Sequence, residues 1–280
     1  MQSAYGSGSC NQTSKYRFSK QKYSILLKSF LKSKFFNRDC VRTVYSLSLY
    51  GKVVDTALLG KEDKQDMFSL MDEFYDNISN RVFLEDLSEK DHCILLMDEK
   101  GDIKGFSTQK ILSVEVDTQK VWGVFSGDTI IHREHWGSLE LFKVFAQYYV
   151  RYGEQYGVFY WFLISKGYKT YKMLPLFFNE FYPHFNKKTP EFESAVMNSF
   201  GNKKYPMEYD AKKGVIVYGG KRDRLKEGVA DISEKQLKDK NIEFFTKINP
   251  GYIEGDDLVC LTKLTRDNFN KTAQRLFLGK

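Results

Sequence analysis

The sequence predicts an α+β protein with a mixed sheet, and three observations support this fold class. The chain has 280 residues, of which 42% are hydrophobic and 16% aromatic, so it can bury the core of one large domain or of two small ones. Three strand-like runs follow one another between residues 92 and 132. The third run leads directly into a helical stripe and then into a wholly apolar run, which is the pattern of a strand, a crossover helix and a parallel strand.

The first clear helix precedes these strands. Residues 57–79 place apolar side chains at steps of three and four, and the stripe consists of Met67, Leu70, Met71, Phe74, Tyr75 and Ile78. The next two runs are separated by the polar turn 98–102, in which Gly101 can adopt a positive φ, so they predict a β-hairpin. A third strand over residues 120–132 extends the hairpin to an antiparallel meander.

Helix and strand alternate after the meander. A stripe at helical period ends near Gly153 and consists of Leu139, Leu141, Phe142, Phe145, Tyr148 and Tyr149. Residues 157–164 form a continuous apolar run, as expected of a strand that is covered on both faces. A short helix is expected next, with Ser165 as a candidate cap and Pro175 as its stop or kink.

The remaining third of the chain has weaker signals. Residues 186–210 are polar enough for a long loop. Beyond them we expect a strand over 213–220, a helix within 233–248 and a strand over 256–264. We therefore divide the chain into a basic N-terminal helical segment (1–56), a catalytic-type core (57–185) and a C-terminal α/β extension that packs on the core (186–280).

The positive charge is concentrated near the N-terminus. Residues 11–38 contain eight Lys or Arg and no acid, whereas the whole chain has a formal net charge of +7. This segment also has an apolar stripe, which predicts a basic amphipathic helix. The helix either packs on the core or docks on an acidic partner protein or an anionic membrane surface. Nucleic-acid binding is not expected, because no recognition motif accompanies the charge.

Other composition features bear on localisation. The sequence has no run of eighteen apolar residues and no signal-peptide core, so we expect neither a membrane span nor export. The four cysteines are scattered without CxxC pairing, which favours a reducing compartment: Cys10, Cys40, Cys93 and Cys260. We expect a cytoplasmic protein of bacterial type.

The junction between the third strand and its helix carries the most specific chemistry. Backbone N–H groups in the first turn of a helix lack internal acceptors and can bind a phosphate. Trp136, Gly137, Ser138 and Leu139 supply such groups, with Arg133 and His135 beside them. The alternative is that Gly137 and Ser138 merely turn the chain and cap the helix.

This order of elements, with a phosphate-binding turn between strand and helix, resembles the GNAT superfamily of acyl-CoA N-acyltransferases. The resemblance covers residues 93–183, about a third of the chain. In that family the turn reads Gln/Arg-x-x-Gly-x-Gly/Ala, and its amides hold the pyrophosphate of coenzyme A. Here Gly137 takes the central position, with Glu134 in place of Gln or Arg and Leu139 in place of Gly or Ala.

The resemblance also implies catalytic groups. Tyr171 takes the place of the tyrosine that protonates the departing thiolate, with Tyr168 as a substitute, although Tyr171 can equally be a core aromatic. A base is needed as well, because an ammonium must lose a proton before it attacks. The candidates on the last two meander strands are Asp128, His132 and Glu115. Asp128 stands in an otherwise apolar strand, so it has either a role or a hydrogen-bonding partner.

The resemblance also implies contacts with coenzyme A. They fall at the end of the third strand, in the turn that follows it, and at the end of the apolar strand 157–164. The strand backbone near 130–132 would pair with the pantetheine arm as an added strand does. The residues implied to contact the cofactor are Ile130, Ile131, His132, Arg133, His135, Trp136, Gly137, Ser138, Leu139 and Ser165. Six aromatic residues nearby either fill the core or shape a pocket: Phe106, Trp122, Phe125, Tyr160, Trp161 and Phe162.

The function implied is transfer of an acyl group from acyl-CoA, or from an acyl carrier protein, to a small-molecule amine or a peptide. The basic N-terminal helix would suit an acidic carrier. The alternative class is a non-catalytic binding or scaffold protein of the same fold, attached to an acidic partner or to a membrane surface. No metal is expected, since His132 and His135 stand three apart without further ligands in view.

Overall fold

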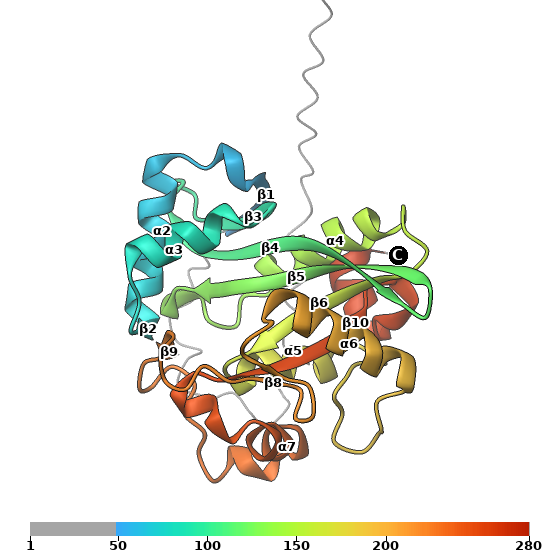
Figure 1. The fold of residues 1–280 in the computed structure, drawn as a ribbon. Coiled ribbons are helices and arrows are strands. Elements are labelled where there is room, and N and C mark those ends of the chain that lie inside the picture. The colour runs from blue at the N-terminus through green and yellow to red at the C-terminus, as the bar shows by residue number, and fades with distance from the viewer. Residues whose placement is uncertain (1–48, 280) are drawn as a thin grey trace, which may run out of the picture. The chain divides into compact units, whose positions relative to one another are not determined.

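The computed structural model describes residues 49–279, which belong to one compact unit; the predicted basic helix within 11–38 lies outside them. Eight strands form one sheet in the order β1-β3-β4-β5-β6-β10-β8-β7, and β2 and β9 form a separate pair (Figure 1). The strands are β1 Tyr50–Asp55, β2 Tyr75–Asp76, β3 His92–Met97, β4 Ile103–Val116, β5 Gln119–Ile131, β6 Phe159–Ser165, β7 Tyr209–Asp210, β8 Val215–Ile216, β9 Arg224–Leu225 and β10 Asp257–Lys263.

The central strands confirm the predicted fold class. β3, β4 and β5 form the antiparallel meander, and β6 lies parallel to β5 after the crossover helix. The turn between β3 and β4 is fixed by Asp98, whose carboxylate accepts the N–H groups of Lys100 at 2.9 Å and Asp102 at 3.1 Å. Gly101 has a φ of 93° in this turn, as its sequence position suggested. β10 pairs antiparallel with β6, so the sheet is mixed.

Helices cover both faces of this sheet. One face packs against α4, α5, α7 and α8. The opposite face packs against α2 and α3 over β3 and β4, and against α6 over β6 and β10. None of the helices within residues 49–279 is long and apolar enough to cross a bilayer. The α-helices are α2 Lys61–Phe74, α3 Asn80–Ser88, α4 Glu140–Gly153, α5 Tyr168–Phe177, α6 Glu191–Lys204, α7 Lys240–Ile248 and α8 Lys271–Ala273.

The crossover helix α4 forms where its apolar stripe predicted. Its stripe is buried against the sheet, and Phe142 stacks on Phe177 of α5 with ring centroids 4.9 Å apart. At its C-terminal end Gly153 lies against Phe159, where a Cβ atom would come within 2.9 Å of the ring. The predicted aromatic cluster is also in the core; the buried members are Phe106, Phe125, Tyr160, Trp161 and Phe162, while Trp122 is half-buried and stacks on Tyr156.

Several sequence expectations for the outer elements are wrong. Residues 191–204, expected within a long loop, form α6, which buries Val196, Met197 and Phe200 on the sheet. The first predicted helix is shorter than 57–79 and ends at Phe74. The strand expected over 213–220 has only two paired residues, and the helix expected within 233–248 begins at Lys240. The proposed Ser165 cap is replaced by Gly167, which precedes α5 without a side-chain cap. β1 and α3 were not anticipated.

Candidate active site

The parallel strands β5 and β6 diverge in the middle of the sheet. Their pairing ends at Ser126 and Leu163, whereas β4 stays paired with β5 as far as Ile131. The end of β6 instead pairs only with β10. Residues 127–131 therefore have no strand partner on the β6 side among the described residues, so the two parallel strands separate here, and we call this separation the opening.

The backbone on this free edge follows from the pairing with β4. The N–H of His132 donates to the carbonyl of Lys104 at 2.9 Å, which makes these two residues a hydrogen-bonded pair. Because such pairs alternate along an antiparallel ladder, the N–H and C=O groups of Thr129 and Ile131 point toward the opening. Of these groups, the carbonyl of Ile131 accepts the indole N–H of Trp136 at 2.8 Å.

A bulge lies at the point where the strands separate. Ser107 opposes Thr129 while Gln109 opposes Ser126, so β5 has an extra residue here. Gly127 is required at this position, because a Cβ atom would lie 2.8 Å from Thr108 Oγ1 and 3.0 Å from Lys90 Cε. The hydroxyl of Thr108 is buried and has no hydrogen-bond partner within the described part of the chain. The bulge thus places Asp128 beside the opening.

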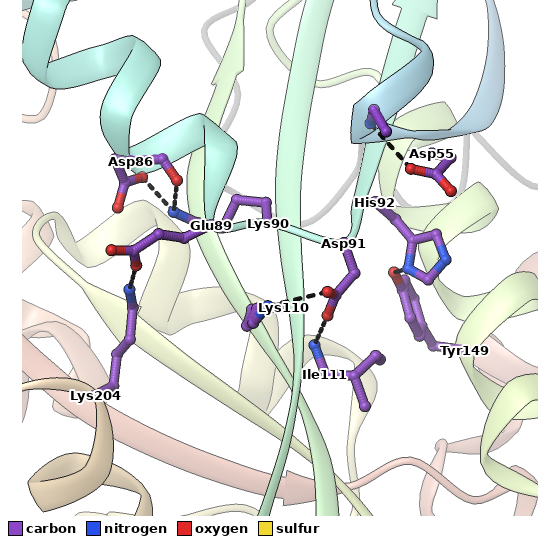
Figure 2. A network of polar contacts seen from close by, with 11 residues as sticks. Asp55, Asp86, Glu89, Lys90, Asp91, His92, Lys110, Ile111, Tyr149 and Lys204 are labelled. Carbon is purple, nitrogen blue, oxygen red and sulfur yellow. Dashed lines mark hydrogen bonds and ion pairs between the residues drawn. The ribbon is translucent and has the colours of Figure 1, made fainter.

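A network of polar contacts around Lys90 joins α3, β4 and α6 (Figure 2). The Lys90 ammonium, which is almost fully buried, pairs with Asp86 at the end of α3. The next residue, Asp91, accepts the N–H of Ile111 on β4 at 2.6 Å. Lys204 of α6 reaches Glu89 at 2.7 Å, so α3 and α6 are joined across this face of the sheet (Figure 2).

Asp128 is the one sequence-predicted base that lies beside the opening with a shifted pKa. Its side chain is half-buried and makes no hydrogen bond or ion pair with another described residue. Burial, together with the Asp86 carboxylate, raises the pKa of Asp128 to about 7, against the opposing effect of Lys90. A carboxylate with a pKa near neutrality is suited to proton transfer. Glu115, the other strand acid considered, is exposed near the far end of β4 and opposes Lys120.

A second charged cluster follows the end of β6. The Lys166 ammonium lies 3.3 Å from Asp223 and 3.4 Å from Asp257, and it donates to the carbonyls of Asp223 and Gly255. Burial raises the pKa of Asp257 to about 6, although Lys166 opposes this shift. Tyr218 donates to the same carboxylate at 3.2 Å. This cluster was not anticipated, because Lys166 is more than 50 residues from the other members in the sequence.

Two further tyrosines connect the clusters. Tyr75 and Tyr205 are only half-buried, yet burial is the main cause that raises the pKa of both phenols. Asp128 contributes to the raised pKa of each phenol, so both phenols lie close enough to its carboxylate to be influenced by its charge. The hydroxyl of Tyr75 has no hydrogen-bond partner among residues 49–279.

The predicted phosphate turn begins as a single 3₁₀ turn, Arg133–His135, between β5 and α4. The amide of Trp136 donates to the carbonyl of Arg133 at 3.2 Å, and that of Ser138 to the carbonyl of His135 at 2.9 Å. Gly137 has a φ of 95°, which favours glycine. The amides of Gly137 and Leu139 have no acceptor within the described residues.

The side chains of this turn are oriented in ways that the sequence did not reveal. The hydroxyl of Ser138 accepts the N–H of Glu140, the first residue of α4, at 3.3 Å, but the N-cap residue of the helix is Leu139. The Arg133 guanidinium lies over the Trp136 ring, 5.3 Å from its centroid. The Lys169 ammonium of α5 lies 3.8 Å from the same centroid. Trp136 and Lys169 therefore bridge β5 and α5 at the opening.

Other predicted site residues lie in the core. Ile130 is buried among the side chains under α2 and α3, while Ile131 is half-buried on the opposite face. Ser165 is fully buried, and its hydroxyl meets only Cys260 Sγ at 3.9 Å. Tyr171 is fully buried too, and its hydroxyl donates to the carbonyl of Pro183 at 3.0 Å. Tyr171 is therefore not brought to Asp128, and Ser165 is not directed at the opening.

Histidines 132 and 135 flank the turn. His132 is half-buried between two carboxylates, with Nε2 3.7 Å from Glu73 and Nδ1 3.9 Å from Glu134. Burial lowers the pKa of His135, and His132 lowers it further. The imidazole of His135 is therefore neutral at pH 7.

Residues 223–230 cross the same end of the sheet. The N–H of Lys226 donates to the carbonyl of Phe74 at 2.9 Å, and β9 pairs with β2. On the other side, Lys169 donates to the carbonyl of Val229. In Figure 1 this segment, with β9, lies beside β2. The sequence "KRDRLKEG" contains no signal for this crossing, which depends on partners distant in the chain.

The meander, the parallel pair joined by a crossover helix and the divergence of that pair define a GNAT-type fold. No protein-family model matches the sequence, and no curated protein is detectably similar to it. Solved structures match the fold at low identity. One is described as a conserved protein of unknown function and probable N-acyltransferase from Enterococcus faecalis, at 14% identity and a TM-score of 0.35, covering 47% of this chain and 33% of that one.

Two further matches are similar in extent. Saccharomyces cerevisiae N-myristoyltransferase with bound myristoyl-CoA matches at 15% identity and a TM-score of 0.34, over 42% of this chain and 29% of that one. An Escherichia coli GNAT family N-acetyltransferase in complex with CoA matches at 15% identity and a TM-score of 0.35, over 53% of this chain and 79% of that one. This chain thus spans about a third of the first two proteins. At these TM-scores the likeness concerns the fold and carries no inference about activity.

Proposed function

We propose that this chain is an N-acyltransferase that takes an acyl group from a coenzyme A thioester and passes it to an amine. The observation that carries the proposal is the divergence of β5 and β6 after Ser126 and Leu163, with Asp128 beside the opening. A pantetheine arm laid along the free edge of β5 would find the N–H groups of Thr129 and Ile131. Its thioester would then lie at the bulge, next to the carboxylate.

In the proposed reaction the amine nitrogen attacks the thioester carbonyl. Asp128 accepts the proton that the nitrogen loses, the C–N bond forms, and the C–S bond breaks. The sulfur leaves as a thiolate and takes up a proton. We assign this proton to Tyr75 rather than Tyr171, because the Tyr75 phenol is influenced by the Asp128 carboxylate and has no hydrogen-bond partner among the described residues, whereas Tyr171 donates to Pro183.

The diphosphate of the cofactor would bind at the amides of Gly137 and Leu139. These groups precede the first turn of α4, where the helix dipole favours negative charge. Glu134 opposes such binding by its charge, while Arg133 and Lys169 supply positive charge beside Trp136. An acyl carrier protein would present the same phosphopantetheine arm, and its acidic surface would be attracted by the basic segment 11–38.

The acceptor would approach from the side of Tyr75 and Tyr205. Carboxylates such as Asp128 and Asp223 favour a cationic amine there, either a small molecule or a peptide. The separated cysteines, including buried Cys93 and Cys260, fit action in the cytoplasm.

A non-catalytic binding protein of the same fold is the second candidate. Its support is specific: Trp136 and Lys169 lie against each other at the opening, and residues 223–230 cross the same end of the sheet. If these groups keep their places, no thioester arm can enter.

Ligand binding separates the two candidates. The full chain is titrated with CoA, acetyl-CoA and a long-chain acyl-CoA, and its melting temperature is measured. A ligand at 100 times its Kd stabilises by about 2.7 kcal/mol, which corresponds to a rise of about 5–10 °C for a chain of this size. Gly137→Val should abolish the rise, whereas Gly101→Val, at a glycine with nearly the same φ in a remote turn, should preserve it. No rise with any of the three ligands would reject the enzyme and favour the binding protein.

A further inference from the structure

The turn between β5 and α4 holds a cluster of side chains that the acyl-transfer proposal does not use as a set. His132, Glu134 and His135 each offer one ligand atom, and the three atoms lie within 4.8 Å of one another. The backbone of the turn is fixed before any ligand binds, because the amide of His135 donates to the carbonyl of His132 at 2.9 Å. The cluster is therefore largely preformed.

A carboxylate lies near each ring nitrogen of His132, at a distance longer than a hydrogen bond. Its Nδ1 faces Glu134, and its Nε2 lies 3.7 Å from a carboxylate oxygen of Glu73 on α2. A histidine that ligates a metal through one ring nitrogen usually donates the other N–H to a carboxylate, which orients the ring. Nδ1 is contacted by the amide of Glu134 only at 3.4 Å, which is long for a hydrogen bond.

The second imidazole has an unsatisfied nitrogen. Nε2 of His135 is buried, and it has no hydrogen-bond partner within the described residues. A buried polar atom without a partner costs free energy, and a metal–nitrogen bond would remove that cost.

The nearby cations do not neutralise Glu134. The guanidinium of Arg133 lies over the aromatic rings of Phe74 and Trp136 instead. Lys104, which faces His135 from β4, pairs with Asp98 and Asp102. The carboxylate of Glu134 is exposed, and its one ion-pair contact within the described residues is with His132.

We propose that His132, Glu134 and His135 bind a divalent transition-metal ion, Zn²⁺ in the first place, with Glu73 orienting His132. Two imidazoles and one carboxylate are a ligand set of zinc sites that keep a fourth position open. Bonds of about 2.0–2.2 Å to a tetrahedral ion place ligand atoms roughly 3.4 Å apart, so the cluster must contract slightly. The exposed side chain of Glu134 can supply that movement. The proposal does not depend on acyl transfer.

The test is metal binding by the untagged full-length protein. Zn²⁺ is titrated by calorimetry, and Co²⁺ is followed by its visible absorption. We expect one ion per chain in both titrations, and loss of binding in His132→Ala and His135→Ala. Glu73→Gln should weaken binding by about 10-fold to 100-fold, as expected when the carboxylate partner of a ligating histidine is removed. His184→Ala, at a histidine that packs between Phe181 and Phe185, is the matched control and should bind normally.

Two results would overturn the proposal. One is the absence of saturable binding of Zn²⁺ and Co²⁺. The other is binding that survives both His132→Ala and His135→Ala, which would place the ion elsewhere in the chain. If a histidine variant fails to fold, Glu134→Gln still tests the metal site. The Glu134 side chain is exposed, so replacing it leaves no cavity.

Discussion

The ammonium of Lys166 lies 3.4 Å from the carboxylate of Asp257, and both side chains are largely inaccessible, with 13% and 2% of their surfaces exposed. Lys166 directly follows β6, and Asp257 is the first residue of β10. A buried ion pair therefore joins the ends of β6 and β10, two neighbouring strands of the sheet. The same ammonium also donates to two carbonyl groups, so its charge is well compensated.

This pair leads to a prediction about stability. Lys166→Met should lower the free energy of unfolding by about 3–5 kcal/mol, because it leaves Asp257 buried without its partner. The measurement is urea unfolding at pH 8. Glu89→Gln is the control: the Lys204–Glu89 pair is shorter, at 2.7 Å, but Glu89 is 61% exposed. Glu89→Gln should lower the free energy of unfolding by less than about 1 kcal/mol. Equal losses in the two variants would contradict this account.

A second prediction concerns the pH dependence of acyl transfer. The base must be ionised, and the pKa of Asp128 is about 7, so kcat/KM should rise with pH through that value. Asp128→Asn should lower kcat by about 10²-fold to 10⁴-fold and remove that limb of the profile. Glu115→Gln, at the exposed acid near the far end of β4, should leave the profile unchanged. An unaltered pH limb in Asp128→Asn would exclude Asp128 as the base.

Asp128 should also affect stability in a direction opposite to that of most acids. Its pKa is raised in the folded state, so between about pH 4, its unfolded value, and about pH 7 the folded protein binds the extra proton. The contribution of Asp128 to stability therefore falls as the pH rises through this range. Asp128→Asn should be more stable than the parent protein at pH 8, and this advantage should disappear at pH 4. Thermal melts of the two proteins at both pH values check the sign.

A fourth prediction separates two tyrosines. Tyr171→Phe should cost about 1–3 kcal/mol of stability, because it leaves the Pro183 carbonyl without its donor, and it should change kcat little. Tyr75→Phe removes a hydroxyl with no hydrogen-bond partner among the described residues, so it should lower kcat at nearly constant stability. Steady-state rates and urea unfolding of both variants test this assignment. The reverse pattern would restore Tyr171, the acid implied by the sequence.

The central fold was predictable because its signals are local. The periodicity of the apolar residues predicted the meander, α4 and β6. Asp128 was recognised as a candidate because it is a polar residue in an otherwise apolar strand. The helix α6 was not predicted because its sequence is polar overall, although Phe192, Val196 and Phe200 recur every four residues.

The site was less predictable than the fold. The position of Tyr171 could not be inferred, since helical spacing does not tell a buried phenol from an accessible one. The clusters around Lys166 and Tyr75 depend on residues 223–230, whose contacts with Lys166 and with β2 are long-range. For His132 and His135, the sequence reasoning overlooked Glu134 between them, and no pattern placed Glu73 nearby.

The position of β10 bears on how the chain acquires its structure during synthesis. β10 is an interior strand, hydrogen-bonded to β6 on one side and to β8 on the other, and six of its seven residues are buried. Until the ribosome has delivered residues 257–263, the edge of β6 lacks a neighbour and exposes apolar side chains to other nascent polypeptides. Chaperone capture during translation is thus expected to involve the 157–164 segment before the last strand closes the sheet.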